Sequence, residues 1–167
     1  MKNADQPDFN TVLDLSKLAD EDAFTVSVIG SEEFAEWLKR AQNYLLGYRW
    51  ARSIQRNFIG YVEPGILAVF LFKIEPEHQD VDPWIWVIVG DLPSAYIPCF
   101  EITDPWSALD GYLYEMERWS DAVLRNGPLD NLFPVDADAT TLLAESLKDR
   151  ISLIRDKILP NVPRSCT

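Results

Sequence analysis

Residues 66–100 read ILAVFLFKIEPEHQDVDPWIWVIVGDLPSAYIPCF, and this stretch decides the fold. Ile66–Ile74 and Trp84–Val89 are rich in β-branched and aromatic residues and apolar at successive positions, which is typical of strands buried on both faces. The turn residues Gly90–Pro93 then lead into a shorter strand expected at Ala95–Phe100. The sequence therefore predicts consecutive strands that need cover on both sides.

A further strand is expected just before this stretch. Arg52–Tyr61 alternates loosely between polar and apolar residues, and Glu63–Gly65 has the composition of a turn. Strands joined by short turns favour an antiparallel meander of about four strands.

Apolar residues at helical spacing predict three helices, at about 31–47, 104–125 and 138–159. Asp104 and Asp138 are suitable N-cap residues for the second and third of these helices. The expected fold class is α+β: a small antiparallel sheet packed with an N-terminal helix and two C-terminal helices.

The chain length of 167 residues suits a single domain, expected over residues 9–167. Residues 1–8 are polar and are expected to form a frayed tail. Residues 9–30 contain one expected strand, Phe24–Ile29, with a short helix before it.

The charge is strongly acidic and unevenly distributed. The chain has 27 acidic and 15 basic residues, a net charge of −12, and residues 76–138 alone hold 13 acidic and two basic residues. This sign argues against direct binding of nucleic acid or of an anionic membrane surface. The excess either serves solubility or forms a surface that attracts a basic partner.

The N-terminal sequence lacks the pattern of a signal peptide, and the longest apolar run, Ile66–Phe72, is too short to span a bilayer. Cys99 and Cys166 have no metal-binding spacing, and nothing specific supports a disulfide between them. A cytoplasmic protein with reduced thiols is the simplest interpretation.

The chain contains one histidine, His78, which lies among acidic residues expected to form a loop. No serine occurs in a Gly-x-Ser-x-Gly turn, and glycine-rich phosphate loops are absent from the sequence. His78 and its carboxylate neighbours could hold a divalent ion, but a solvated acidic loop is favoured. We therefore predict no catalytic residue, no metal and no cofactor.

Three further groups of residues allow more than one interpretation. Asp91 follows an apolar strand, where functional carboxylates often lie, but it is also an ordinary turn residue. The Asp-x-Asp pairs Asp80/Asp82 and Asp136/Asp138 could provide acid–base chemistry, but a hydrophilic turn explains the first pair and the Asp138 cap explains the second.

Arg49, Arg52 and Arg56 form a basic cluster that would share a face if the first helix continued past Trp50. They could contact phosphate or an acidic partner, but internal neutralisation of acidic residues is their favoured role.

Twenty aromatic residues make up 12% of the chain. Trp37, Trp106 and Trp119 are expected in the core. Trp84 and Trp86 point to one sheet face and are expected to pack under a helix; on an open face they would form a binding anchor instead.

Tyr112 and Tyr114 lie off the apolar stripe of their helix and are expected to be exposed. Together with nearby carboxylates they suggest one acidic surface, centred on the 75–83 loop and the outward face of the 104–125 helix. The expected partner-binding residues are Glu75, Glu77, Asp80, Asp82, Asp91, Asp110, Tyr112, Tyr114, Glu117 and Asp121.

Three segments carry a family resemblance: WIWVIVGDLPSAYIPCF at 84–100, ALDGYLYEMERW at 108–119 and FPVDADATTLLAESLKDR at 133–150. Across about residues 66–158 the chain resembles small acidic bacterial α+β proteins that are similar to immunity proteins accompanying polymorphic or type VI secreted toxins. Gly90–Tyr96 is the most specific piece. The resemblance brings no active-site residue with it.

This resemblance implies an immunity-type protein that neutralises a cognate toxin, for example a nuclease, by stoichiometric binding of an acidic surface to a basic domain. One alternative is a small-molecule-binding protein or enzyme that uses Asp91 and His78 near a tryptophan-lined sheet. Another is a homo-oligomeric adaptor joined through an edge strand. Monomer and homodimer both remain open.

Overall fold

The computed structural model describes residues 19–20, 31–100 and 102–164. Its centre is an antiparallel sheet with the strand order β1-β2-β3-β4-β5. The strands are β1 (Ala19–Asp20), β2 (Ala51–Glu63), β3 (Leu67–Pro76), β4 (Trp84–Gly90) and β5 (Ala95–Pro98). The meander is confirmed, and the two-residue β1 is an additional strand that pairs with Phe58 and Ile59 of β2.

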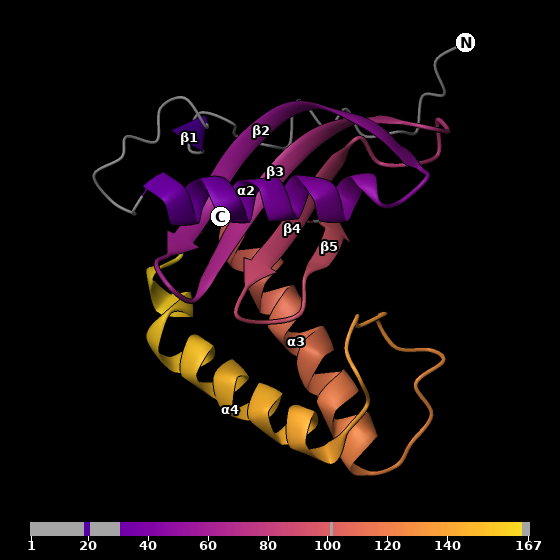
Figure 1. Ribbon diagram of the computed structural model, residues 1–167, viewed down its shortest axis with the longest axis vertical. Helices are drawn as coiled ribbons and strands as arrows, with labels where there is room; N and C mark the ends of the chain where they lie inside the picture. Colours follow the sequence, from indigo (N-terminus) through magenta and orange to yellow (C-terminus); the bar gives the residue numbers. More distant parts are fainter. Residues whose placement is uncertain (1–18, 21–30, 101, 165–167) are drawn as a thin grey trace.

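The helices are α2 (Ser31–Leu46), α3 (Pro105–Leu124) and α4 (Thr141–Lys157), followed by a short 3₁₀ turn, η3 (Leu159–Asn161). Helix α2 crosses one face of the sheet, whereas α3 and α4 form a pair that extends from the opposite side (Figure 1). This is the expected α+β arrangement. The expected strand Phe24–Ile29 and helix before it lie outside the described residues.

Both faces of the sheet are covered, as the apolar runs predict. On the α2 side, Phe70 of β3 packs among Ala41 and Leu45 of the helix. On the other side, Leu71 packs with Leu109 of α3. Every residue of β4 is buried, because each of its two faces meets a helical layer.

The tryptophan expectations are largely confirmed. Trp84 and Trp86 lie in the core beneath α3, and the indole N–H of Trp86 donates to the carbonyl oxygen of Ile102 at 2.9 Å. Trp37 and Trp119 are also buried, whereas Trp106 is only partly covered.

The helix ends show one agreement and one correction. The Asp104 carboxylate accepts a hydrogen bond from the backbone N–H of Ser107 at 2.7 Å, so it caps α3 as expected. Asp138 does not cap α4. The cap is Thr140, whose hydroxyl accepts from the N–H of Leu143 at 3.2 Å, because the helix begins three residues later than the pattern indicated.

Candidate binding surface

The segment Gly90–Tyr96, the most specific piece of the resemblance, forms a tightly anchored turn between β4 and β5. Gly90 has a φ of 144°, and its neighbour Asp91 donates its backbone N–H to the carbonyl oxygen of Ile66 at 2.9 Å. The hydroxyl of Tyr112 donates to the carbonyl oxygen of Pro93 at 2.7 Å. These contacts explain the segment as a structural element.

Two arginines hold the same turn from opposite sides of the sheet. Arg40 of α2 donates to the carbonyl oxygen of Gly90 at 2.9 Å. Arg150 of α4 forms an ion pair with the Asp91 carboxylate at 2.8 Å and also donates to the Asp91 carbonyl oxygen. A cleft of about 430 Å³ lies here, but its two guanidinium groups already have partners within the chain. Asp91, expected to meet a partner, is therefore already paired.

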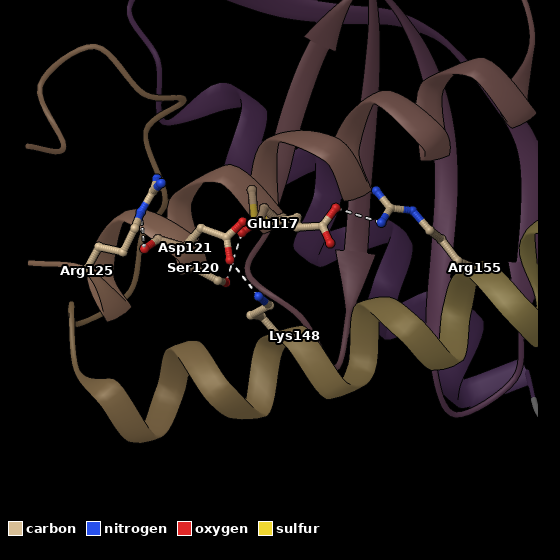
Figure 2. A network of polar contacts seen from close by, with 7 residues as sticks. Glu117, Ser120, Asp121, Arg125, Lys148 and Arg155 are labelled. Carbon is tan, nitrogen blue, oxygen red and sulfur yellow. Dashed lines mark hydrogen bonds and ion pairs between the residues drawn. The ribbon is translucent and has the colours of Figure 1, made fainter. Parts of the chain in front are cut away.

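Two carboxylates of α3 are, like Asp91, paired with basic side chains of α4. Glu117 pairs with Arg155 at 2.7 Å and Asp121 pairs with Lys148 at 2.6 Å, both partners being on α4 (Figure 2). Beside them, the Ser120 hydroxyl donates to the carbonyl oxygen of Met116 inside the helix pair. Glu117 and Asp121 thus link α3 to α4.

The expectation that Tyr112 is exposed is wrong. Its side chain is 1% exposed, because it belongs to the core on the α3 side of the sheet and its hydroxyl reaches Pro93 in the β4–β5 turn. Burial raises the pKa of its phenol, which therefore stays protonated. Tyr114 is 54% exposed, as expected, and the guanidinium of Arg118 lies 5.7 Å from the centre of its ring. Asp110 is partly exposed on the same helix.

The expected single acidic surface does not form. The 75–83 loop lies at one end of β3 and β4, whereas Asp91 follows the other end of β4. Helix α3 extends away from the loop (Figure 1). Seven residues of β4 separate the two ends, about 20 Å of extended chain. The sequence could not reveal this separation, because it depends on the direction in which α3 leaves the sheet.

Four of the expected residues lie along the end of β3 and the β3–β4 loop: Glu75, Glu77, Asp80 and Asp82. The hydroxyl of Ser53 donates to Glu75 at 3.2 Å. One oxygen of Asp82, Oδ1, accepts from the backbone N–H of Trp84 at 2.9 Å. The other, Oδ2, is buried and has no hydrogen-bond partner.

Two of these carboxylates, Asp80 and Asp82, line a hollow of about 350 Å³ that we call the aromatic hollow. Its lining residues come from the chain before β2, the β3–β4 loop, β4 and β5: Trp50, Asp80, Val81, Asp82, Ile85, Tyr96, Pro98 and Phe100. Burial raises the pKa of the Asp82 carboxyl, although the hydrogen bond from the backbone N–H of Trp84 partly opposes this.

The aromatic walls of the hollow belong to a larger cluster. The Trp50 ring lies 5.0 Å from that of Tyr96 and 5.3 Å from that of Tyr48, measured between centroids. The hydroxyls of Tyr44 and Tyr48 are 3.1 Å apart. Trp50 and Tyr96 were not among the expected site residues. As aromatic residues they could have been considered candidates for a binding site. They are 46 positions apart, however, and only the sheet brings them together.

The residues of the enzymatic alternative are not brought together. His78 is exposed in the β3–β4 loop, 3.9 Å from Glu77, and Asp91 lies at the opposite end of β4. Trp84 and Trp86, which were to line that site, are buried in the core. Among residues 19–20, 31–100 and 102–164, no group of three or more histidine, cysteine or acidic side chains is placed to hold a metal ion.

The three arginines expected to form a basic cluster neither share a helix face nor pair with carboxylates of the described residues. Helix α2 ends at Leu46, so Arg49, Arg52 and Arg56 do not share a helix face. The guanidinium of Arg56 lies 4.6 Å from the centre of the Phe58 ring. Within the described part of the chain, carboxylates pair with arginines and lysines of α4 and with Arg118 rather than with this cluster.

No helix in the described ranges is long and apolar enough to cross a membrane. Cys99 is a free, buried cysteine, and burial raises the pKa of its thiol. Cys166 lies outside the described residues. Comparison with protein-family models, curated proteins and solved structures gives no match for this chain.

Proposed function

We propose that this protein binds a basic protein partner, in the manner of an immunity protein that neutralises a toxin stoichiometrically. One observation carries the proposal: an aromatic hollow lined by Asp80 and Asp82 lies at the β3–β4 end of the sheet, and Glu75 and Glu77 precede it in the same strand and loop. This surface is smaller than the sequence suggested, since Asp91, Glu117 and Asp121 are paired within the chain.

Charge and apolar contact affect different steps of the proposed binding: charge affects association, and apolar contact affects dissociation. The net charge of −12 speeds encounter with a basic domain, an effect that salt screens. Aromatic side chains in a partly enclosed site supply anchors that slow dissociation. A toxin nuclease fits this picture, since its substrate cleft must be basic to hold phosphate.

The same proposal places the protein in the bacterial cytoplasm, with its partner being protein rather than nucleic acid or membrane. It works as a monomer or as a homodimer. No catalytic step is assigned to it.

The test is co-expression of this chain with the product of each adjacent gene. We expect one neighbouring product to inhibit growth when expressed alone, to lose that effect with this chain, and to co-purify with it in a one-to-one ratio. Failure of every neighbour to co-purify and to be neutralised would rule out the immunity proposal.

A pair of charge-matched variants locates the surface. One variant carries Glu75→Gln, Glu77→Gln and Asp80→Asn, and its control carries Glu145→Gln, Asp149→Asn and Asp156→Asn on the exposed side of α4. Both lose three negative charges. Only the first should weaken the complex by about tenfold or more, since it alone removes charge at the contact. Equal weakening would mean that net charge, not this surface, drives binding.

A further inference from the structure

We propose that the aromatic hollow receives a single arginine side chain presented by the basic partner. This inference rests on the proposed function, and it adds the chemical identity of the group that enters. The occupant is a guanidinium that stacks on an aromatic wall while its N–H groups face carboxylates.

The walls of the hollow suit a flat cation. Trp50 and Tyr96 both line it, and their rings are inclined at 59° to each other. Tyr48 stacks on Trp50 at 5.3 Å and meets Tyr96 edge-on at 4.9 Å, so each wall is supported from behind. Rings held in place in this way lose little freedom when a cation stacks on them.

The rim of the hollow supplies the matching charge. Asp80 and Asp82 are among its lining residues, and Asp80 is exposed. The Oδ2 atom of Asp82 is buried without a hydrogen-bond partner, an arrangement that a nearby positive charge would stabilise. An apolar hollow with carboxylates on one side favours a ligand that is both apolar along its stem and cationic at its tip.

The size of the hollow and the chemistry of the cation favour an arginine side chain over other ligands. A volume of about 350 Å³ is at the small end of the range for ligand pockets, which suits one side chain better than a larger ligand. Guanidinium is planar, weakly hydrated and able to bind carboxylate through two N–H groups, whereas ammonium is compact and strongly hydrated. The chain already uses the same contact elsewhere: the guanidinium of Arg164 lies 3.8 Å from the centre of the Trp106 ring.

The test uses the isolated protein and a small probe, so it does not depend on a partner. Isotope-labelled protein is titrated with Nα-acetyl-arginine methylamide and followed by NMR, with the Trp50 indole N–H and the Ile85 methyl groups as reporters. We expect saturable shifts centred on these reporters. The neutral isostere Nα-acetyl-citrulline methylamide should leave them unchanged, and the acetylated lysine methylamide should bind more weakly than arginine.

Three variants test the assignment. Asp80→Asn should weaken arginine binding by about threefold to fivefold, since it removes one rim charge. Trp50→Leu keeps an apolar wall but loses the π face, and about a threefold weakening is expected. Asp110→Asn removes the same charge from α3 and should leave binding unchanged. Each variant is checked for an unchanged spectrum away from the hollow.

Shifts that do not saturate, equal binding of citrulline, or stronger binding of lysine would each overturn the proposal. The two failures are distinguishable. If a neighbouring toxin binds this protein but arginine does not enter the hollow, this inference fails and the proposed function stands. If arginine enters the hollow but no neighbouring product binds, the immunity proposal fails.

Discussion

Gly90 occupies a position that other residues cannot adopt without displacing the chain. A β carbon there would lie 2.2 Å from the carbonyl oxygen of Ile66 and 2.6 Å from the Cα of Leu67. Both contacts are with backbone, which cannot rotate away as a side chain can. Close approach of the β2–β3 turn to the β4–β5 turn therefore requires glycine.

We predict that Gly90→Ala lowers the free energy of unfolding by about 3 kcal/mol or more. The matched control is Gly65→Ala, which also has a positive φ, of 75°, but meets nothing within 4 Å. Its expected cost is about 1 kcal/mol, from conformation alone. Urea denaturation measures both, and equal costs would show that the close approach is not the cause.

Asp82 gives a pH-dependent prediction. Desolvation raises the pKa of its carboxyl above the ordinary value of about 3.9, so the folded protein binds this proton more tightly than the unfolded chain. The charged carboxylate therefore destabilises the fold at neutral pH, and this effect is relieved as the pH falls through the raised value.

We expect the free energy of unfolding of Asp82→Asn, relative to wild type, to be higher at about pH 7 than at about pH 4. The measurement is urea denaturation across this range. Asp80→Asn, an exposed neighbour, controls for the change in net charge. A difference for Asp82→Asn that is constant with pH, or that grows toward acid, would contradict the assignment.

At the scale of elements, α4 is attached to the rest of the molecule by apolar packing and by ion pairs. Ala144, Leu147, Ile151 and Ile154 are its buried residues and form the stripe that meets α3. The ion pairs of Figure 2 lie at the exposed edge of this contact, where solvent screens them and such pairs contribute little to stability. Apolar burial thus dominates the attachment.

The N-terminus of α4 can be tested with two neighbouring substitutions. Thr140→Ala removes the hydroxyl that accepts from Leu143 and should lower the free energy of unfolding by about 1 kcal/mol. Asp138→Ala, at the cap position that the sequence suggested, should change it by less than about 0.5 kcal/mol. Thermal denaturation distinguishes the two, and a larger effect at Asp138 would show that the helix begins earlier.

At the scale of the whole molecule, one sheet separates two apolar cores. Phe70 and Leu71 are consecutive residues of β3 that are completely buried on opposite faces. The α2 side and the α3–α4 side are therefore both parts of the folded core. Each helical layer is needed to bury one apolar face of the sheet.

We predict that Phe70→Ala lowers the free energy of unfolding by about 3–5 kcal/mol and Leu71→Ala by about 2–5 kcal/mol. Leu142→Ala, at an exposed position of α4, should change it by less than about 0.5 kcal/mol. Chemical denaturation of the three variants provides the comparison. A small effect of Phe70→Ala would mean that α2 is only loosely attached.

Much of the fold could be predicted because its signals are local. The two-sided apolar runs of β3 and β4, the helical stripes and the Asp104 cap each depend on residues a few positions apart. The candidate site was less accessible to sequence reasoning. Counting carboxylates along the chain put Asp80 and Asp121 on one surface, although distance along a sequence says little about distance in space.

The sequence by itself determined the strands, the helices and the need for cover on both faces, since hydrophobic periodicity and turn chemistry act over short range. Only the tertiary structure decided which charges remain available to a partner. It paired Asp91 with Arg150, turned Tyr112 into the core and brought Trp50 beside Tyr96. The physical reason is that strand pairing and long-range packing, including the direction of α3 and α4, set the neighbours of each side chain.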